Sequence, residues 1–528
     1  MTLGMPAART GTKSALAWGL PALVAILVTV LFHPQWVKGF SDAAGGGPVS
    51  AAVPLAASAV TFLLVLVLFS EAIELWMAPS PAAGEQGEFL ALMAVSVSLF
   101  WTAVFFPALM SGDSLDQWSQ ALTGEYTTWH PPLMAMLMHF TQHLSKGPAP
   151  FALLQGVLFW ASIYWALASA VPAHRRWLIA CALITCNPAL WTCTSVLWKD
   201  VWAATFALFS IPPLVAAIDR RSNRHLLWGA VSIGLAACFR HNAPTMLLAP
   251  FLGGWGYVWR DWSVGRKAAW SVGLALIVLL PGRLIDRLPS VRANGTPAAM
   301  LIVHYVGVAA RMDPGSAAFR DERARFDGTF GPGALDRCTA AYLAELPAGD
   351  YFIFGQSPVV SLPNLVAHTS FVLRETAGIS ARHPILCLCQ KVSSLSRLMQ
   401  APPHAVWYPY YTQLDPWGAS IGLKSHSLLP DVRHRAFGIL RLLRNGVLFR
   451  HYLFIVWSVV ALAFLARHRT PVFVSALVGL SYAAGLVVAD AACPDWRFLL
   501  TTYLCAWIGL FSWLFQGRSM APGNKICR

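Results

Sequence analysis

Long apolar runs separated by short polar segments recur along almost the whole chain. A helix needs roughly 20 mostly apolar residues to cross a bilayer. Twelve runs approach that length: Ala15–Phe32, Ala52–Phe69, Phe89–Met110, Phe151–Val171, Leu178–Val196, Val201–Ile218, Leu226–Phe239, Met246–Val258, Ala268–Leu280, Phe454–Ala466, Val472–Val488 and Phe498–Phe515. The pattern therefore predicts an all-α, polytopic membrane protein with about twelve transmembrane helices.

Positive charges alternate between the connections in a way that indicates an orientation. Arg9 and Lys13 precede the first run, and basic groups at 174–176, 220–224 and 260–267 fall in connections on the same side. Lys and Arg concentrate on the cytoplasmic side of membrane proteins. We therefore expect both termini to be cytoplasmic and the first apolar run to be retained as a signal anchor.

The same pattern divides the chain into three parts. Residues 1–282 form an N-terminal membrane domain and residues 446–528 the C-terminal membrane helices, whereas residues 283–445 lack a convincing span and are richer in polar residues, Pro and Gly. We expect this middle part to be a large external loop with short helices of its own. Four cysteines fall on the outer side, where a disulfide can form but spacing does not identify the pair: Cys338, Cys387, Cys389 and Cys493.

One outer stretch, residues 111–148, is rich in polar side chains. Asp113 and Asp116 are three residues apart, which places both carboxylates on one face of a helix. The apolar positions between and after them also have helical spacing: Leu115, Trp118 and Leu122. His130 then opens a His-Pro-Pro-Leu turn, and proline is tolerated in the first turn of a helix. The apolar segment that follows is too short to span, so we expect a second helix that lies on the outer surface or dips into the membrane.

Composition supports a membrane location and narrows the function. Of the 528 residues, 56% are hydrophobic and only 12% are charged, which is too apolar for an average soluble protein. The formal net charge is +14, but the basic residues are spread over short loops. The sequence has no nucleotide-binding glycine fingerprint, Walker motif or nucleic-acid-binding motif. We therefore expect no nucleic-acid partner and an activated donor other than a nucleotide.

Ionisable residues gather at the outer ends of the predicted spans, where they are costly and therefore candidates for function. Asp113 and Asp116 are the catalytic candidates, since a carboxylate can take a proton from an acceptor hydroxyl. The substrate-binding candidates include cations that can stabilise a leaving phosphate: His130, Lys199, Asp200, Arg240, His241, Asp495 and Arg497.

Several of these candidates also have ordinary structural explanations. Lys199 and Asp200 are adjacent and are also typical of a surface ion pair. Asp495 with Arg497 also fits a helix end, and His241 a histidine satisfied within the core.

A second group of arginines departs from the charge rule. These side chains lie in the expected external part, just before a predicted span: Arg433, Arg435, Arg441, Arg444 and Arg450. Two interpretations remain open. The arginines suit the anionic headgroups of the outer leaflet, and they also suit a phosphate carried on a lipid substrate.

Short motifs resemble those of a known superfamily. An Asp at the membrane edge of an early outer loop, followed by HPPL at His130–Leu133, resembles the GT-C integral membrane glycosyltransferases, including protein O-mannosyltransferases and aminoarabinose transferases of lipid A. WKD at Trp198–Asp200, RHN at Arg240–Asn242 and PDWRFLL at Pro494–Leu500 resemble uncharacterised bacterial members. The chain departs from the mannosyltransferases in two ways. Its two acidic residues are separated, and three predicted spans precede the loop instead of one.

The resemblance implies an inverting hexosyl or pentosyl transfer at the periplasmic face of a bacterial inner membrane. The donor would be a polyprenyl-phosphate sugar, and the acceptor a cell-envelope glycan, lipid or protein. Asp113 would be the general base, with Asp116 as the second choice or as a residue that positions the acceptor, and His130 would shape the loop. The lipid phosphate would be bound by Lys199, Arg240 and Arg497. No metal ligands are assigned, and assistance by a divalent cation is left open.

The main alternative is a transporter or flippase of lipid-linked oligosaccharide. Such a protein carries ionisable residues near the middle of its spans and often has paired halves. The predicted spans are mostly apolar through their centres, and the sequence shows no internal repeat. An envelope polymerase is a third alternative, which would use outer-loop arginines more than an early Asp. The sequence favours the glycosyltransferase.

Overall fold

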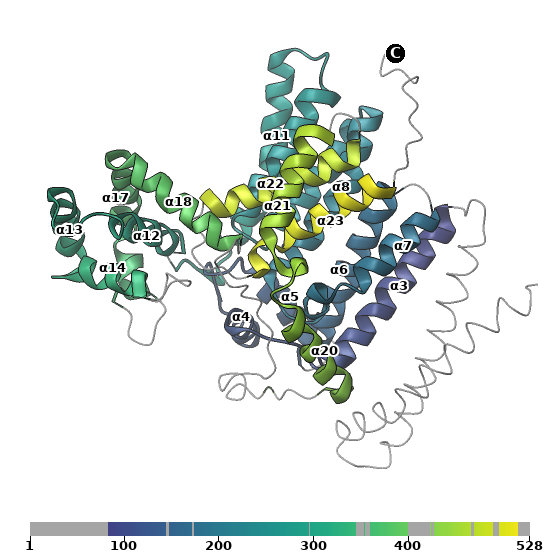
Figure 1. Ribbon diagram of the computed structural model, residues 1–528, viewed down its shortest axis with the longest axis horizontal. Coiled ribbons are helices and arrows are strands. Elements are labelled where there is room, and N and C mark those ends of the chain that lie inside the picture. Colours follow the sequence, from purple (N-terminus) through teal and green to yellow (C-terminus); the bar gives the residue numbers. More distant parts are fainter. Residues whose placement is uncertain are drawn as a thin grey trace, which may run out of the picture.

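The computed structural model describes residues 83–143, 147–171, 174–294, 296–344, 353, 359–399, 423, 427–465, 469–488 and 496–515. About 80% of the structure is helical. In the described part, strands are limited to one short parallel pair, β1 (Tyr126–Thr127) with β2 (Val291–Arg292). The chain is an all-α membrane protein, because six of the described helices are long and apolar enough to cross a membrane (Figure 1).

The six long apolar helices coincide with predicted runs. They are α3 (Ala83–Val104), α6 (Ala149–Ala170), α8 (Lys199–Arg220), α11 (Val264–Ile285), α22 (Thr470–Val488) and α23 (Leu500–Phe515), the last preceded by the 3₁₀ turn η8 (Trp496–Leu499). Most side chains of α11 are exposed, including Leu276 and Leu279. A helix that exposes leucine in this way is suited to contact lipid.

Four predicted spans form shorter, bent or broken helices. Residues 178–196 are divided between α7 (His174–Thr185) and the turns η1 (Pro188–Leu190) and η2 (Thr192–Thr194), with a bend of 62°. Pro188 explains the bend, because proline has no N–H to donate and its ring crowds the preceding turn. Residues 226–239 lie in α9 (Asn223–Ala237), which has only 15 residues.

Residues 246–258 form three short helical pieces and not one span. These are η3 (Ala243–Leu247), α10 (Leu248–Gly253) and the π-helical turn η4 (Gly254–Val258). The tenth predicted span is a shorter apolar helix, α21 (His451–Val460), continued by the π-helical turn η6 (Ala461–Leu465). The first two predicted spans, 15–32 and 52–69, lie outside the described residues. The total of twelve spans therefore stays a prediction.

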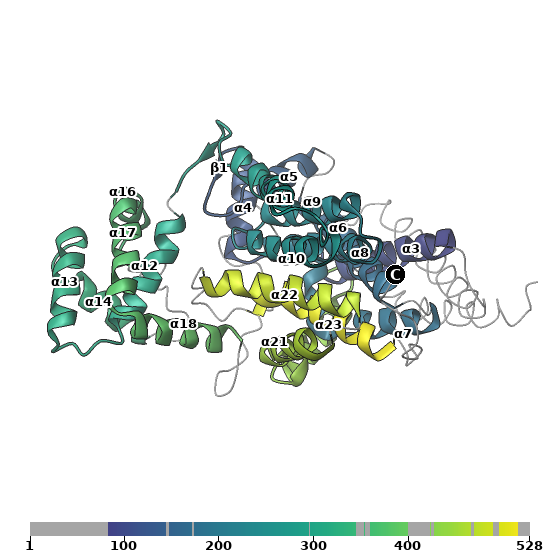
Figure 2. The ribbon, with the colours of Figure 1, turned by 90° about the horizontal axis from the view of Figure 1, so that it is seen from above.

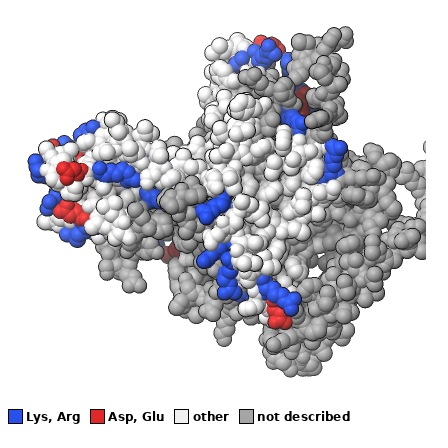
Figure 3. Space-filling model, viewed as in Figure 1, with Lys and Arg blue, Asp and Glu red and all other residues white. Residues whose placement is uncertain are grey.

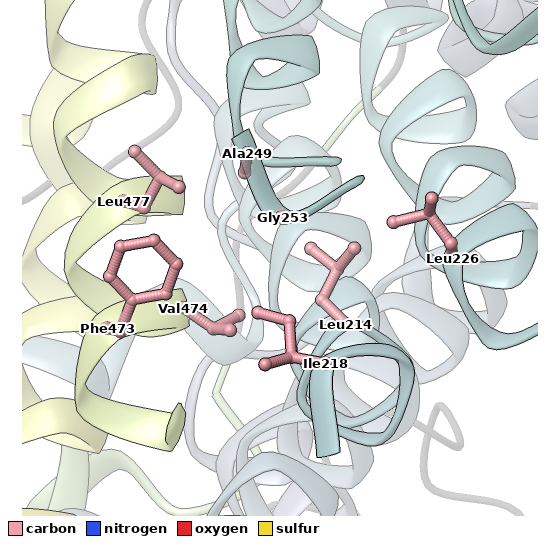
Figure 4. A pocket seen from close by; sticks show the side chains of 8 residues that line it. All are labelled: Leu214, Ile218, Leu226, Ala249, Gly253, Phe473, Val474 and Leu477. Carbon is pink, nitrogen blue, oxygen red and sulfur yellow. The ribbon is translucent and has the colours of Figure 1, made fainter. Parts of the chain in front are cut away.

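One large hydrophobic core joins the membrane helices, with α8 at its centre. α8 packs against α6, α9, α22 and α23. A small cavity of about 10 Å³ near its C-terminal end has room for about one water (Figure 4). All the residues that line it are apolar: Leu214, Ile218, Leu226, Ala249, Gly253, Phe473, Val474 and Leu477. This cavity offers no polar group to a substrate.

The helices from α12 to α18 form a second helical unit, which we call the loop lobe (Figure 1, Figure 2). It consists of α12 (Thr296–Ala309), α13 (Ala317–Phe330), α14 (Ala334–Ala344), α16 (Leu362–Ala367), α17 (Thr369–Arg382) and α18 (Pro384–Leu398). The loop lobe has a hydrophobic core of its own. Its surface carries both signs of charge, while the membrane helices are mostly uncharged on the face shown in Figure 3.

Specific contacts hold the loop lobe together and attach it to the membrane helices. Buried Glu322 of α13 accepts two hydrogen bonds from Arg382 of α17, from Nε at 2.7 Å and from Nη2 at 2.9 Å. Lys391 of α18 donates to the carbonyl of Val487 in the last turn of α22, at 3.0 Å. Of the four cysteines expected on the outer side, Cys338, Cys387 and Cys389 are free thiols, and Cys493 lies outside the described residues.

Candidate functional site

The predicted helix with two carboxylates is present as α4 (Gly112–Thr123). Leu115 and Trp118 are buried, which confirms the helical spacing of the apolar positions. Leu122 is exposed, and Ala121 takes its place on the buried face. The apolar pattern therefore predicts the helix correctly but is one residue off at its last buried position.

The residues before α4 are fixed against those before α8. Leu109 and Val196 form a parallel β-bridge, and Leu109 donates its backbone N–H to the carbonyl of Ser195 at 3.0 Å. Trp198 donates its indole N–H to the hydroxyl of Ser111 at 3.1 Å. These contacts place the first turn of α8 directly beside the first turn of α4.

Asp113 is held by two buried cations from distant parts of the sequence. Its Oδ2 lies 3.2 Å from Nζ of Lys199 in α8 and 3.0 Å from Nη2 of Arg497 in η8. Burial alone would raise the pKa of Asp113, but the charges of Arg497 and Lys199 outweigh it and hold the pKa well below its usual value. Asp113 is therefore ionised at neutral pH and a weak proton acceptor.

His130 lies between the two carboxylates of α4. Its Nε2 is 3.9 Å from Oδ1 of Asp113 and 4.0 Å from Oδ2 of Asp116, and its Nδ1 is hydrogen-bonded to Nζ of Lys199. Burial and the charge on Lys199 lower the pKa of His130 well below its usual value, so the ring is neutral at pH 7. An ammonium group can only donate. Nδ1 therefore accepts, and the proton is on Nε2, facing both carboxylates.

Asp116 has a different environment from Asp113. Among the described residues it has no ion pair with Lys or Arg, and its carboxylate accepts a hydrogen bond from Nε2 of Gln120 at 2.7 Å. Burial and the negative charge of Asp113 raise the pKa of Asp116, and the hydrogen bond from Gln120 offsets this only in part. Its side chain is 39% exposed. Asp116 is thus the more basic and more accessible of the two carboxylates.

The helix that follows begins after the His-Pro-Pro turn, as predicted. α5 (Leu133–Gln142) has ten residues and is too short to span a membrane. Its His139 is hydrogen-bonded through Nδ1 to the carbonyl of Ala121, at 2.6 Å. This contact packs the end of α5 on the end of α4. The turn between them keeps His130 beside Asp113 and Asp116.

A second ion pair lies next to Lys199 in α8. Asp200 of α8 is fully buried, and its Oδ1 lies 2.9 Å from Nη2 of Arg240, which follows α9. The guanidinium of Arg240 also stacks over the ring of Phe498, 4.6 Å from its centre. The surface-pair interpretation of Lys199 and Asp200 is therefore wrong, because both side chains are buried and each pairs with a different partner.

The structure brings most of the candidate residues together. We use the name acid–base cluster for Asp113, Asp116, His130, Lys199 and Arg497. Asp200 and Arg240 lie next to the cluster. His241 is exposed and is hydrogen-bonded to the backbone of Thr128, so it is not a core histidine. Asp495 lies outside the described residues.

Three residues that shape this site are not among those predicted from the sequence. Gln120 fixes the carboxylate of Asp116 through a hydrogen bond. Its position four residues further along the same helix indicates such a contact, because residues at that spacing are neighbours on the helix surface. Trp198 and Phe498 lie under the guanidinium of Arg497, at 5.2 and 5.4 Å. Trp198 belongs to the WKD motif and Phe498 to the DWRF motif, so these motifs could have indicated both residues as part of the site. Within the described ranges, no three His, Cys, Asp or Glu side chains are arranged to hold a metal ion.

Comparison with known proteins does not assign a family, because no protein-family model, curated protein or solved structure matches this chain. The chemistry of the acid–base cluster is therefore the basis for a function. It combines an accessible carboxylate, a neutral imidazole and two buried cations at the ends of membrane helices. Such a set can accept a proton and stabilise a developing negative charge at the same place.

Proposed function

We propose that this chain is an integral membrane glycosyltransferase. It moves a sugar from a polyprenyl-phosphate donor to a hydroxyl of a cell-envelope glycan, lipid or protein, on the outer face of the bacterial inner membrane. The observation that carries the proposal is the position of accessible Asp116 one helical turn after Asp113, whose carboxylate is paired with the buried cations Lys199 and Arg497, at the ends of apolar helices. A donor whose tail stays in lipid can present its phosphate and sugar at that level.

The proposed reaction is a single displacement. The acceptor oxygen forms a bond to the anomeric carbon of the sugar while its proton passes to a carboxylate. The bond between the anomeric carbon and the phosphate oxygen breaks, and polyprenyl phosphate leaves with the electron pair. The product is a glycoside of inverted configuration. Lys199 and Arg497 stabilise the charge that develops on the leaving phosphate.

We assign the general base to Asp116, which reverses the order given by the sequence. A general base is most effective when its pKa lies near the working pH. The two cations bound to Asp113 make it a weak base, whereas the pKa of Asp116 is raised and its side chain is open to an acceptor. In this assignment Asp113 positions the cations, and His130 helps to orient Lys199 through its hydrogen bond to Nζ.

The distribution of charge in the spans supports an enzyme over a transporter. In the described spanning helices, ionisable residues lie within a few residues of the ends, such as Lys199 and Asp200 at the start of α8 and Arg220 at its end. A transport path is typically marked by ionisable groups near the middle of the spans. The alternative of a flippase for lipid-linked oligosaccharide therefore has less support.

The test uses the full chain, purified and placed in lipid nanodiscs. Synthetic polyprenyl-phosphate hexose and pentose are supplied with a cell-envelope extract as the acceptor source, and the release of polyprenyl phosphate is measured. We expect Asp116→Asn to lower the rate by about 100-fold or more, since general base catalysis contributes at least that factor. Asp321→Asn, at an exposed position of α13, is the matched control and should retain full activity.

Two results would contradict the proposal. One is full activity in both Asp116→Asn and Asp113→Asn at equal protein levels. The other is a failure of the unmodified protein to consume any donor while it moves intact donor across a vesicle bilayer, which would establish the flippase.

A further inference from the structure

Helix α20 (Pro430–Leu443) is attached at both ends to the outer ends of apolar helices. Just before it, the backbone N–H of Leu428 donates to the carbonyl of Ala103 in the last turn of α3, at 3.1 Å. After α20 and the 3₁₀ turn η5 (Val447–Phe449), His451 begins α21, and its Nε2 lies 2.8 Å from the carbonyl oxygen of Trp496 at the start of η8.

The length of α20 fits a position along the membrane surface. Its 14 residues span about 21 Å at 1.5 Å per residue, too short to cross a bilayer. Because these contacts join the segments before and after α20 to the end of α3 and to the start of η8, we infer that α20 lies at the level where these spans end. This is the level of the lipid headgroups.

The side chains of α20 are divided between a buried face and an exposed apolar flank. Ala436, Phe437 and Leu440 are buried against the membrane helices. The apolar side chains that remain exposed on α20 and in the turn after it are Ile439 (40%), Leu442 (81%), Leu443 (38%) and Val447 (69%). Leucine and valine exposed together in this way indicate a surface that another apolar phase covers.

Arginines lie beside this apolar flank. Arg435, Arg441 and Arg444 are all exposed, and Asp431 in the first turn is the acidic residue of the helix. An apolar flank with flanking arginines is typical of helices that lie in the plane of a membrane and contact anionic headgroups. α20 packs against α3 and η1, whereas the cations of the acid–base cluster come from α8 and η8.

We propose that α20 is an interfacial helix that docks on the anionic headgroup layer of the outer leaflet, with Leu442 and Val447 among the acyl chains and Arg435 and Arg441 at the headgroup phosphates. The occupant of this surface is bilayer phospholipid, and the proposal does not depend on the glycosyltransferase reaction. Of the two interpretations that the sequence leaves open for these arginines, the proposal adopts binding to the headgroups of the outer leaflet.

The first experiment measures the depth of α20 in vesicles that contain the full chain. A genetically encoded dansyl amino acid is placed at position 442, 447 or 343, since Leu343 is an exposed leucine of the loop lobe and serves as the matched control. We expect lipids with brominated acyl chains to quench the probe at 442 and 447, and aqueous iodide to quench the probe at 343. Strong iodide quenching at 442 would overturn the proposal in favour of a water-exposed surface or a protein partner.

The second experiment tests the charge of the lipid. Vesicles of phosphatidylcholine alone are compared with vesicles in which about one third of the lipid is phosphatidylglycerol. We expect phosphatidylglycerol to increase lipid quenching at position 442 about twofold, and the combination of Arg435→Gln with Arg441→Gln to remove that increase. A response to added short-chain polyprenyl phosphate, with none to phosphatidylglycerol, would instead assign the arginines to a lipid substrate and overturn the proposal.

Discussion

Asp113 and Asp116 are identical side chains on one face of one helix, and their surroundings give them opposite properties. The guanidinium of Arg497 and the ammonium of Lys199 hold the pKa of Asp113 low, while burial and the negative charge of Asp113 raise the pKa of Asp116. Pairs of titratable groups whose pKa values are separated in this way often divide the roles of a reaction between them. The difference between two neighbouring aspartates is therefore the most specific chemical property of this site.

The pH dependence of activity should report the pKa of Asp116. If Asp116 is the base, kcat/KM falls as the pH is lowered through its pKa, because protonation removes the base; since that pKa is raised, the fall occurs above the usual range for aspartate. Gln120→Met removes the hydrogen bond that favours the charged form. We expect the acidic limb of the kcat/KM profile to move to higher pH in this variant.

Ser119→Ala, on the same helix and without a contact to either carboxylate in the described structure, is the control and should leave the profile unchanged. An acidic limb that Gln120→Met does not move would argue against Asp116 as the titrating base. A shift in both variants would indicate a general disturbance of α4.

At the residue scale the sequence predicts which groups matter better than how they are paired. Asp113 and Lys199 stand out because a charge next to an apolar run is costly. The ion pair between Asp113 and Arg497 cannot be predicted from the sequence. The two residues are far apart along the chain, and helix packing decides which ends of the spans lie side by side. The same reason explains why Lys199 and Asp200, adjacent in sequence, pair with different partners.

At the scale of helices, uninterrupted apolar runs are predicted well and interrupted ones are not. The run 246–258, which contains Pro250 and the glycines at 253–254, breaks into short pieces, because proline cannot donate a backbone hydrogen bond and glycine is a poor helix former. α8 nevertheless continues through Pro212 and Pro213. Because four other helices surround α8, packing compensates for the lost hydrogen bonds. The local pattern does not contain that information.

Close packing between elements makes one glycine of α22 intolerant of change. A Cβ atom at Gly485 would lie 2.6 Å from the backbone oxygen of Asn242, just before η3. Backbone cannot move aside as a side chain can, so Gly485→Ala should push α22 and η3 apart and cost about 1–3 kcal/mol, the usual range for overpacking. Thermal unfolding in detergent should show a lower Tm.

Gly273→Ala in α11 is the matched control, since a Cβ there meets nothing within 4 Å. This substitution should keep or slightly raise the Tm, because alanine is the better helix former. Equal Tm values for the two variants would contradict the packing between α22 and η3 described above.

At the scale of the whole molecule, the orientation predicted from charge places the loop lobe outside the cell. Cys389 of α18 is exposed, so a membrane-impermeant maleimide should label it in intact spheroplasts, and Cys389→Ser should reduce that labelling. Asp261 is 78% exposed and lies in a connection expected to be cytoplasmic. Asp261→Cys should add labelling only after lysis. The reverse result for both positions would invert the orientation and move the acid–base cluster to the cytoplasmic face.

The pairing of Asp113 with Arg497 also has a consequence for biosynthesis. Arg497 is made about 300 residues after Lys199, which takes roughly 15–60 s at ordinary translation rates of 5–20 residues per second. During that interval the nascent chain holds an aspartate and a lysine at the membrane edge without their third charge. The complete cluster can therefore form only after η8, which carries Arg497, has been made. A chain released before η8 is made lacks Arg497 and therefore one of the two cations that pair with Asp113.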